Sequence, residues 1–106
     1  MAAALAGLAG CSGIKYAGRY PYDEGWREAS AVAEVRPGEP VGSRLQRDCR
    51  AAASALRDSR YALVRFRQAR EIHYEVVRWP QDGPPPSGRT VYFQSRECAE
   101  DAVIAE

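Results

Sequence analysis

The stretch YALVRFRQAREIHYEVVRW, residues 61–79, decides the fold because it carries the strongest strand signals in the chain. Apolar and polar side chains alternate through residues 64–67 and again through 72–76, which is the period of a strand with one buried face. The residues that share a face are Ala62, Val64 and Phe66 in the first segment and Ile72, Tyr74 and Val76 in the second. QARE, residues 68–71, is the whole connection between them, and so short a connection favours an antiparallel hairpin.

Two further segments, one on each side of this hairpin, have strand character. Residues 30–36, SAVAEVR, are short, contain two valines and are closed by a Pro-Gly turn signal. Residues 90–94, TVYFQ, follow a loop at 81–88 whose prolines cannot donate hydrogen bonds to a sheet. The sequence therefore predicts a strand in each place, and a frayed, mildly acidic tail at 99–106.

The segment before the hairpin has helical spacing. The apolar residues at positions i, i+4, i+7 and i+11 are Leu45, Cys49, Ala52 and Leu56. They form one stripe on a helix. Ser43 stands where it would cap the first turn, with Gln46 three residues on, as in a capping box. The spacing predicts a helix around residues 44–57 with Cys49 on its inward face.

Together these elements predict an α+β fold. We expect a small, mainly antiparallel sheet, able to curl into a small barrel, with one helix around residues 44–57 packed on it. At 106 residues, 45% hydrophobic and 27% charged, the chain has the size and composition of a single small domain. Its formal net charge of +1 argues against a dedicated polyanion binder. After Cys11 no segment reaches the roughly 18 consecutive apolar residues that span a bilayer.

The first eleven residues carry no charged side chain and end in LAGC, residues 8–11. An apolar run, two small residues and a cysteine resemble the lipobox of bacterial lipoproteins. In that family the peptide before the cysteine is removed, and the cysteine becomes the lipid-bearing first residue. The resemblance implies a signal peptide at 1–10, acylation at Cys11, a flexible tether at 11–24 and a globular domain at 25–106.

The leader lacks one feature of secretory signals, the basic segment before the apolar run. Either the true start lies upstream of Met1, or the segment is an Ala-Gly-rich terminus with an incidental cysteine. Ser12, and not aspartate, follows Cys11. In the Gram-negative lipoproteins that this chain resembles, that choice implies sorting to the outer membrane, with the domain held by acyl chains and facing the periplasm.

Cys49 and Cys98 remain once Cys11 carries lipid, and an even number of cysteines in an exported chain indicates a disulfide. The bridge would close a loop of about 50 residues, for which loop entropy suggests stabilisation of roughly 4 kcal/mol. Two alternatives stay open: free buried thiols in a cytosolic chain, and a zinc or catalytic site that includes His73. His73 alternates with the apolar residues of the second strand, so we expect it to point away from the core face.

Arginine is concentrated between residues 44 and 70. Arg50 and Arg57 stand seven residues apart on one side of the predicted helix, and Arg65 and Arg67 lie on the outer face of the next strand. These four are the candidate anion-binding residues. In an exported protein the available anions are phospholipid headgroups, lipopolysaccharide or an acidic partner surface. In a cytosolic protein, arginines beside aromatic rings suit nucleic acid. The alternative is a solvated charged surface.

Catalytic motifs are absent from the sequence: it has no G-x-S-x-G, no phosphate-cradling glycine loop, no H-E-x-x-H and no paired-cysteine metal spacing. We therefore expect a non-enzymatic, lipid-anchored envelope protein with a structural or binding role and no cofactor or metal. Its partners would be the membrane, through Cys11, and an anionic envelope component or partner protein. The alternative is a cytosolic binding module with an arginine-rich face for nucleic acid or another polyanion. A third class is an enzyme that uses Cys49 or Cys98 with His73.

Overall fold

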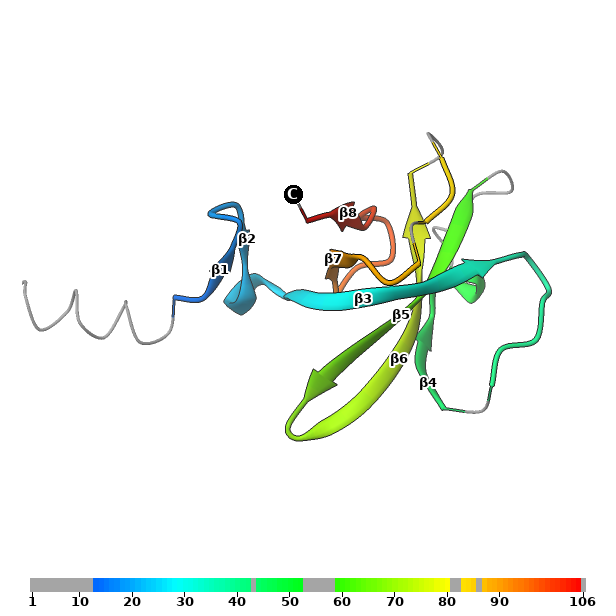
Figure 1. Ribbon diagram of the computed structural model, residues 1–106, viewed down its shortest axis with the longest axis horizontal. Coiled ribbons are helices and arrows are strands. Elements are labelled where there is room, and N and C mark those ends of the chain that lie inside the picture. Colours follow the sequence, from blue (N-terminus) through cyan, green and yellow to red (C-terminus); the bar gives the residue numbers. More distant parts are fainter. Residues whose placement is uncertain (1–12, 43, 53–58, 81–82, 86, 106) are drawn as a thin grey trace, which may run out of the picture.

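The computed structural model describes residues 13–42, 44–52, 59–80, 83–85 and 87–105, which form two β-sheets (Figure 1). The strands are β1 (Lys15–Tyr16), β2 (Tyr20–Pro21), β3 (Trp26–Val35), β4 (Leu45–Asp48), β5 (Arg60–Gln68), β6 (Glu71–Trp79), β7 (Thr90–Gln94) and β8 (Val103–Ile104). The helical segments in these ranges are two short 3-10 turns, η1 (Tyr22–Glu24) and η2 (Cys49–Ala51). No helix in the described ranges has the length and apolar character needed to cross a membrane.

The hairpin predicted from residues 61–79 is confirmed as β5 and β6. The two nine-residue strands stay in unbroken antiparallel register up to the pair Gln68–Glu71. The turn residues Ala69 and Arg70 have φ angles of 52° and 69°. A two-residue turn with both φ angles positive matches the right-handed twist of the flanking strands. The hairpin extends to the lower left of Figure 1.

The larger sheet is mixed, and its strand order is β4-β6-β5-β3-β7-β8. Its neighbouring strands are antiparallel except for β4 and β6, which are parallel. The order is linear, with β4 and β8 at its ends, so the described strands form an open sheet. The sheet is nevertheless curled, so that the two ends of the strand order approach each other. The N–H of Ala102, just before β8, donates to the C=O of Arg78 on β6 (3.0 Å). The predicted α+β class is therefore wrong, and the fold is mostly β.

The helix predicted around residues 44–57 is the main error in that prediction. Over its described part, the chain forms strand β4, which pairs in parallel with β6, followed by the short turn η2. The remainder of the predicted helix, residues 53–58, lies outside the described residues. Sheet pairing with β6 satisfies backbone groups that a helix would have satisfied internally.

A local hydrogen bond fixes the turn that the chain makes after β4. The side chain of Asp48 accepts a hydrogen bond from the backbone N–H of Arg50 (3.0 Å), which caps η2. On a helix, Leu45 and Cys49 would share an apolar stripe. In the structure they also pack in one core cluster. They reach it from an extended strand and a turn, so the apolar spacing was compatible with both structures.

Residues 13–24, placed in the tether by the sequence, contain β1, β2 and η1 and pack on the larger sheet through aromatic rings. Tyr16 stacks on Tyr92 of β7 with ring centroids 5.3 Å apart. Tyr20 lies 4.7 Å from the ring of Trp26 on β3. Aromatic pairs of this kind contribute about 0.5–1.5 kcal/mol each beyond the area they bury. The packing holds this segment beside β3 and β7.

The larger sheet buries side chains on both faces. The cluster on one face consists of Ala29, Ala31, Ala62, Val64, Phe66, Val77, Trp79, Val91, Phe93 and Ala102. The smaller cluster, on the other face, consists of Val35, Cys49, Tyr61 and Val76, with Val41, Leu45, Leu63 and Cys98 packed against it. The alternation predicted along β5 is confirmed, since its two faces enter different clusters. β6 lies between the clusters and is buried on both sides.

The end of the chain is fixed to the sheet, so the frayed tail predicted at 99–106 is wrong over the described residues 99–105. Ala102 is fully buried. Arg78 Nε lies 2.7 Å from Asp101 Oδ1. β8 then adds to the edge of β7. These contacts join the C-terminal segment to both β6 and β7.

Candidate anion-binding face

One face of the larger sheet carries a row of paired residues that runs across most of its strands. The registers place them in the order Thr90, Ser30, Arg65, Tyr74 and Leu45, on β7, β3, β5, β6 and β4. Directly paired residues point to the same face of a sheet, so these side chains stand side by side. Arg65 is exposed in the middle of the row, with the small hydroxyl side chains of Ser30 and Thr90 on one side and the larger, mainly apolar side chains of Tyr74 and Leu45 on the other.

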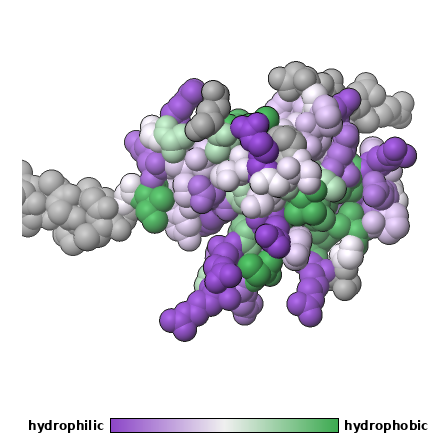
Figure 2. Space-filling model, in the orientation of Figure 1, coloured by the Kyte–Doolittle hydropathy of each residue, from purple (hydrophilic) through white to green (hydrophobic). Residues whose placement is uncertain are grey.

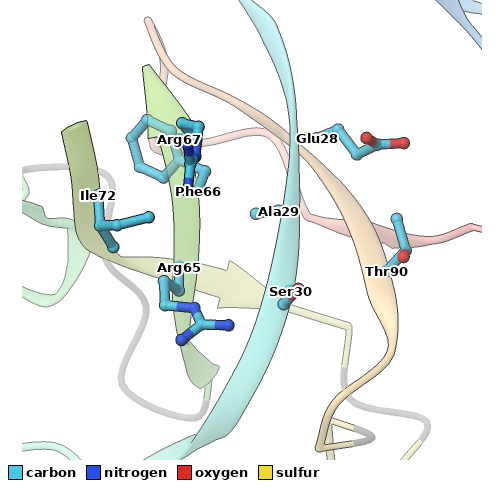
Figure 3. Close-up of a pocket in the computed structure, with 8 residues that line it drawn as sticks. All are labelled: Glu28, Ala29, Ser30, Arg65, Phe66, Arg67, Ile72 and Thr90. Carbon is cyan, nitrogen blue, oxygen red and sulfur yellow. The ribbon is translucent and has the colours of Figure 1, made fainter. Parts of the chain in front are cut away.

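A hollow of about 270 Å³ lies over the hydroxyl half of the row (Figure 3). We call it the arginine cleft; its lining residues are Glu28, Ala29, Ser30, Arg65, Phe66, Arg67, Ile72 and Thr90. Figure 3 shows Arg65 and Ile72 extending toward β3. Glu28 points from the other side of β3, away from β5. The β5 side of the cleft is therefore cationic, and its one carboxylate is directed elsewhere.

The cleft exists because β3 and β5 separate. Their pairing ends where Ser30 lies opposite Arg65, although both strands continue beyond that point. If the register continued, Glu28 would lie opposite Arg67. The described residues contain no strand between them, and the diverging strands leave the space that the side chains line.

A second hollow, of about 400 Å³, lies over the apolar half of the row. We call it the apolar groove; its lining residues are Val41, Gly42, Arg44, Leu45, Leu63 and Tyr74. Along β5, Leu63 in the groove and Arg65 in the cleft are neighbours on one face, and their Cα atoms are about 6–7 Å apart. Along β6, Tyr74 and Ile72 have the same relation. The groove and the cleft therefore adjoin.

The surface over these strands is mixed in character. In Figure 2, hydrophobic surface lies between hydrophilic side chains that project from the lower part of the molecule, where Figure 1 shows the β5–β6 hairpin and β4. Ile72 remains 47% exposed at the edge of the cleft. A surface that presents cations and exposed aliphatic groups together suits a ligand with both an anionic and an apolar part.

The cations of this face have no acidic partner among the described residues. Arg44, Arg65 and Arg67 are exposed, and none forms an ion pair or side-chain hydrogen bond within the described ranges. The ion pairs that the structure does contain there are Arg47–Glu75, Arg50–Asp48, Arg60–Glu34 and Arg78–Asp101. Positive charge on the face is thus left for an external anion.

Arg50, by contrast, makes several internal bonds. Its Nη2 lies 2.7 Å from Asp48 Oδ2, and its Nη1 donates to the C=O of Arg36 (2.7 Å) and of Glu39 (2.8 Å). The side-chain hydrogen bond from Arg50 holds the pKa of Asp48 below its usual value. Arg50 therefore fixes η2 to the loop that follows β3.

Of the four arginines predicted to bind anions, the structure brings Arg65 and Arg67 together in one cleft. Arg50 bonds to the loop after β3, next to the strand end where Tyr61 lies. Along β5, Tyr61 is about 13 Å from Arg65 and about 20 Å from Arg67, so Arg50 lies well away from the cleft. Arg57 lies outside the described residues. The cleft and groove also include residues that sequence reasoning missed, since no motif marks where two strands diverge.

A buried ion pair lies elsewhere in the sheet and was not predicted. Arg47 Nη2 lies 2.9 Å from Glu75 Oε1 and also donates to the C=O of Gln94 (2.9 Å). Glu75 is 4% exposed. Burial raises the pKa of its carboxyl group, and the charge of Arg47 opposes that rise. The available sequence signal was a glutamate between Tyr74 and the two valines at 76–77.

The predicted disulfide is confirmed. Cys49 and Cys98 are bonded to each other, with Cα atoms 5.4 Å apart. Neither is therefore a thiolate that could ligate a metal or attack a substrate. His73 packs on Phe66, at the larger cluster, with ring centroids 5.6 Å apart; the expectation that it points away from the core was wrong. Within the described ranges, no group of three His, Cys, Asp or Glu side chains is placed to hold a metal ion.

Comparison with protein-family models, with curated proteins and with solved structures finds no match to this chain.

Proposed function

We propose that the protein is a lipid-anchored component of the bacterial cell envelope, acylated at Cys11 and held at the outer membrane, with a non-enzymatic binding role. The observation that carries this proposal is the Cys49–Cys98 disulfide. Of the three cysteines in the chain, the disulfide leaves Cys11 outside the pair. Cys11 is also the residue at which the lipobox-like LAGC sequence ends.

The disulfide also favours export over the cytosolic alternative. Disulfides persist in oxidising compartments such as the periplasm, and the cytosol keeps thiols reduced. A cytosolic nucleic-acid-binding module would leave both cysteines as buried thiols. The bond thus supports the compartment that the leader implies.

The cleft and groove support a binding role for the domain. Small-molecule sites are concave, mostly apolar and carry a few placed polar groups, and the two adjoining hollows have that composition. The described side chains around them supply donors and apolar surface, and the general bases they offer are limited to the outward-pointing Glu28. This arrangement is suited to holding an anion.

The anchor can be tested with a single substitution. Expressed with a complete secretory leader in a Gram-negative host, Cys11→Ser should move the protein from the membrane fraction to the soluble periplasmic fraction. The thiol that accepts the acyl chains is gone, and stable attachment needs two or more chains. Fractionation and mass measurement of the N-terminal peptide give the readout.

Ser12→Asp is the matched control. It keeps Cys11 and should remain acylated and membrane-bound, with a shift toward the inner membrane as the resemblance to lipoproteins implies. If the unchanged protein carries no acyl chain, or if Cys11→Ser fractionates as the unchanged protein does, the proposal is wrong.

A further inference from the structure

We propose that the arginine cleft and the apolar groove together bind one anionic phospholipid, with the phosphate diester of its headgroup in the cleft and part of an acyl chain in the groove. The inference deepens the proposed function, because it assigns the binding role to a lipid of the membrane that anchors the domain. It rests on the adjacency of the two hollows, on arginines that have no acidic partner among the described residues, and on the length of chain back to Cys11.

The cleft has the donors that a phosphate diester requires. Arg65 and Arg67 present guanidinium groups without an acidic partner in the described ranges, and Ser30 and Thr90 add hydroxyl groups. Arginine suits phosphate because its planar group donates several hydrogen bonds in a fixed geometry. The single carboxylate of the lining, on Glu28, points away from β5 (Figure 3). An anion in the cleft therefore meets donors on the β5 side.

The groove has the surface that a chain requires. Its walls are supplied by Val41, Leu45 and Leu63, with the ring of Tyr74 between them. The hollow holds about 400 Å³, within the roughly 300–1,000 Å³ of small-molecule sites. The Cα atoms of Arg65 and Leu63 are about 6–7 Å apart on one face of β5. One lipid molecule can therefore place its phosphate in the cleft and part of its acyl chain in the groove.

The path of the N-terminal segment favours a membrane lipid as the source of this phosphate. Tyr16 stacks on Tyr92, which lies opposite Glu28 of the cleft. Burial, and then the nearby charge of Glu28, raise the pKa of Tyr16, in keeping with this proximity. Cys11 lies five positions before Tyr16, and an extended chain of that length reaches at most about 18 Å. An acylated Cys11 would hold the cleft close to the headgroup layer.

The headgroup part of the proposal is tested on the full-length chain carrying Cys11→Ser, so that no acyl anchor contributes to binding. Vesicles of equal parts phosphatidylcholine and phosphatidylglycerol should retain the protein in sedimentation, and vesicles of phosphatidylcholine alone should not. Arg65→Gln with Arg67→Gln should weaken binding to the anionic vesicles about 25-fold, since each arginine near an anionic surface contributes about fivefold. Binding should also weaken as salt rises.

Arg36→Gln with Arg96→Gln is the matched control, because it removes the same charge from exposed positions outside both hollows. The affinity of this control variant for the anionic vesicles should stay within about twofold of that of the protein with these two arginines unchanged. Equal losses in the two double variants would show diffuse attraction and overturn the site. Tighter binding of a single-stranded oligonucleotide than of the anionic vesicles, lost in the cleft variant, would assign the cleft to nucleic acid and also overturn it.

The chain part is tested with soluble ligands. Short-chain phosphatidylglycerol, kept below its micelle concentration, should bind at least tenfold more tightly than glycerol phosphate or inorganic phosphate, as burial of about two methylene groups supplies that factor. Leu45→Gln should abolish this difference while leaving glycerol phosphate binding unchanged. Val41→Gln, in the loop, provides a second variant if Leu45→Gln lowers the urea midpoint of unfolding.

Equal binding of glycerol phosphate and short-chain phosphatidylglycerol would remove the groove from the site and overturn the assignment to a phospholipid. These measurements use a chain that cannot be acylated, so they do not depend on the anchor. Failure of acylation in cells contradicts the proposed function, whereas failure of the cleft variant to lose binding contradicts this inference.

Discussion

Replacing Cys49 and Cys98 together by alanine should lower the free energy of unfolding by about 4 kcal/mol. The bond joins residues 49 positions apart, so it removes a large amount of loop entropy from the unfolded chain. Domains of this size are stable by roughly 5–15 kcal/mol in total, and the loss brings the variant near the lower limit of folding. Urea unfolding of the oxidised protein and of the double variant, extrapolated to water, measures the difference.

The reduced form of the unchanged protein is the control for this substitution. Its stability should fall by a similar amount, since reduction opens the same loop without altering any side-chain volume beyond the sulfurs. Cys11→Ser, which leaves the disulfide intact, should unfold as the unchanged protein does. A loss below about 1 kcal/mol in the double variant would contradict the loop-entropy account.

The β5–β6 hairpin could be predicted because its determinants are local. Apolar and polar side chains alternate over residues 64–67 in one strand and 72–76 in the other, and the connection is short enough to exclude a crossover. The turn itself carried no sequence signal, since Ala69 and Arg70 adopt positive φ without a glycine or asparagine. Alternation alone, then, was sufficient to place both strands and to assign the faces of β5.

The helix around residues 44–57 failed because its signal was compatible with two structures. Leu45 and Cys49 need to reach the same apolar cluster, and a helix or a strand followed by a turn can both deliver them. The choice is made by non-local contacts: parallel pairing with β6 and the bond from Cys49 to a residue near the end of the chain. Tertiary contacts of this kind override a local helical pattern.

The candidate site was predictable in part for a similar reason. Arg65 and Arg67 lie on one face of a strand by simple alternation, so their exposure followed from the sequence. The cleft beside them follows from the point where β3 stops pairing with β5, which no local pattern encodes. The apolar groove depends on β4, whose residues have helical spacing in the sequence. Position on a strand could be predicted, whereas the hollows required the register between strands.

Arg47→Met should cost about 3–5 kcal/mol of stability at neutral pH, because it leaves the carboxylate of Glu75 buried and unpaired. The two side chains are 23% and 5% exposed, and the Arg47 Nη2 to Glu75 Oε1 distance is 2.9 Å. Arg47 also bonds to the C=O of Gln94 on β7, although β6, β5 and β3 separate β4 from β7 in the sheet. The substitution thus removes a contact across the curl as well as the ion pair.

The pH dependence separates the charge effect from the loss of packing. Burial raises the pKa of Glu75 and Arg47 opposes that rise, so the pKa of Glu75 should rise further in Arg47→Met. When the pKa of Glu75 in the folded state lies above its ordinary value of about 4.5, the folded protein binds the proton more strongly than the unfolded chain does. The free energy of unfolding therefore increases as the pH falls from the folded-state pKa toward 4.5. The stability deficit of Arg47→Met relative to the unchanged protein should therefore shrink in acid.

The control is Arg47→Met combined with Glu75→Gln. This double variant should recover most of the lost stability at neutral pH, and its remaining deficit should not shrink in acid. A deficit that is equal at every pH in both variants would mean that packing around Arg47, and not the buried charge of Glu75, determines the stability of this part of the sheet.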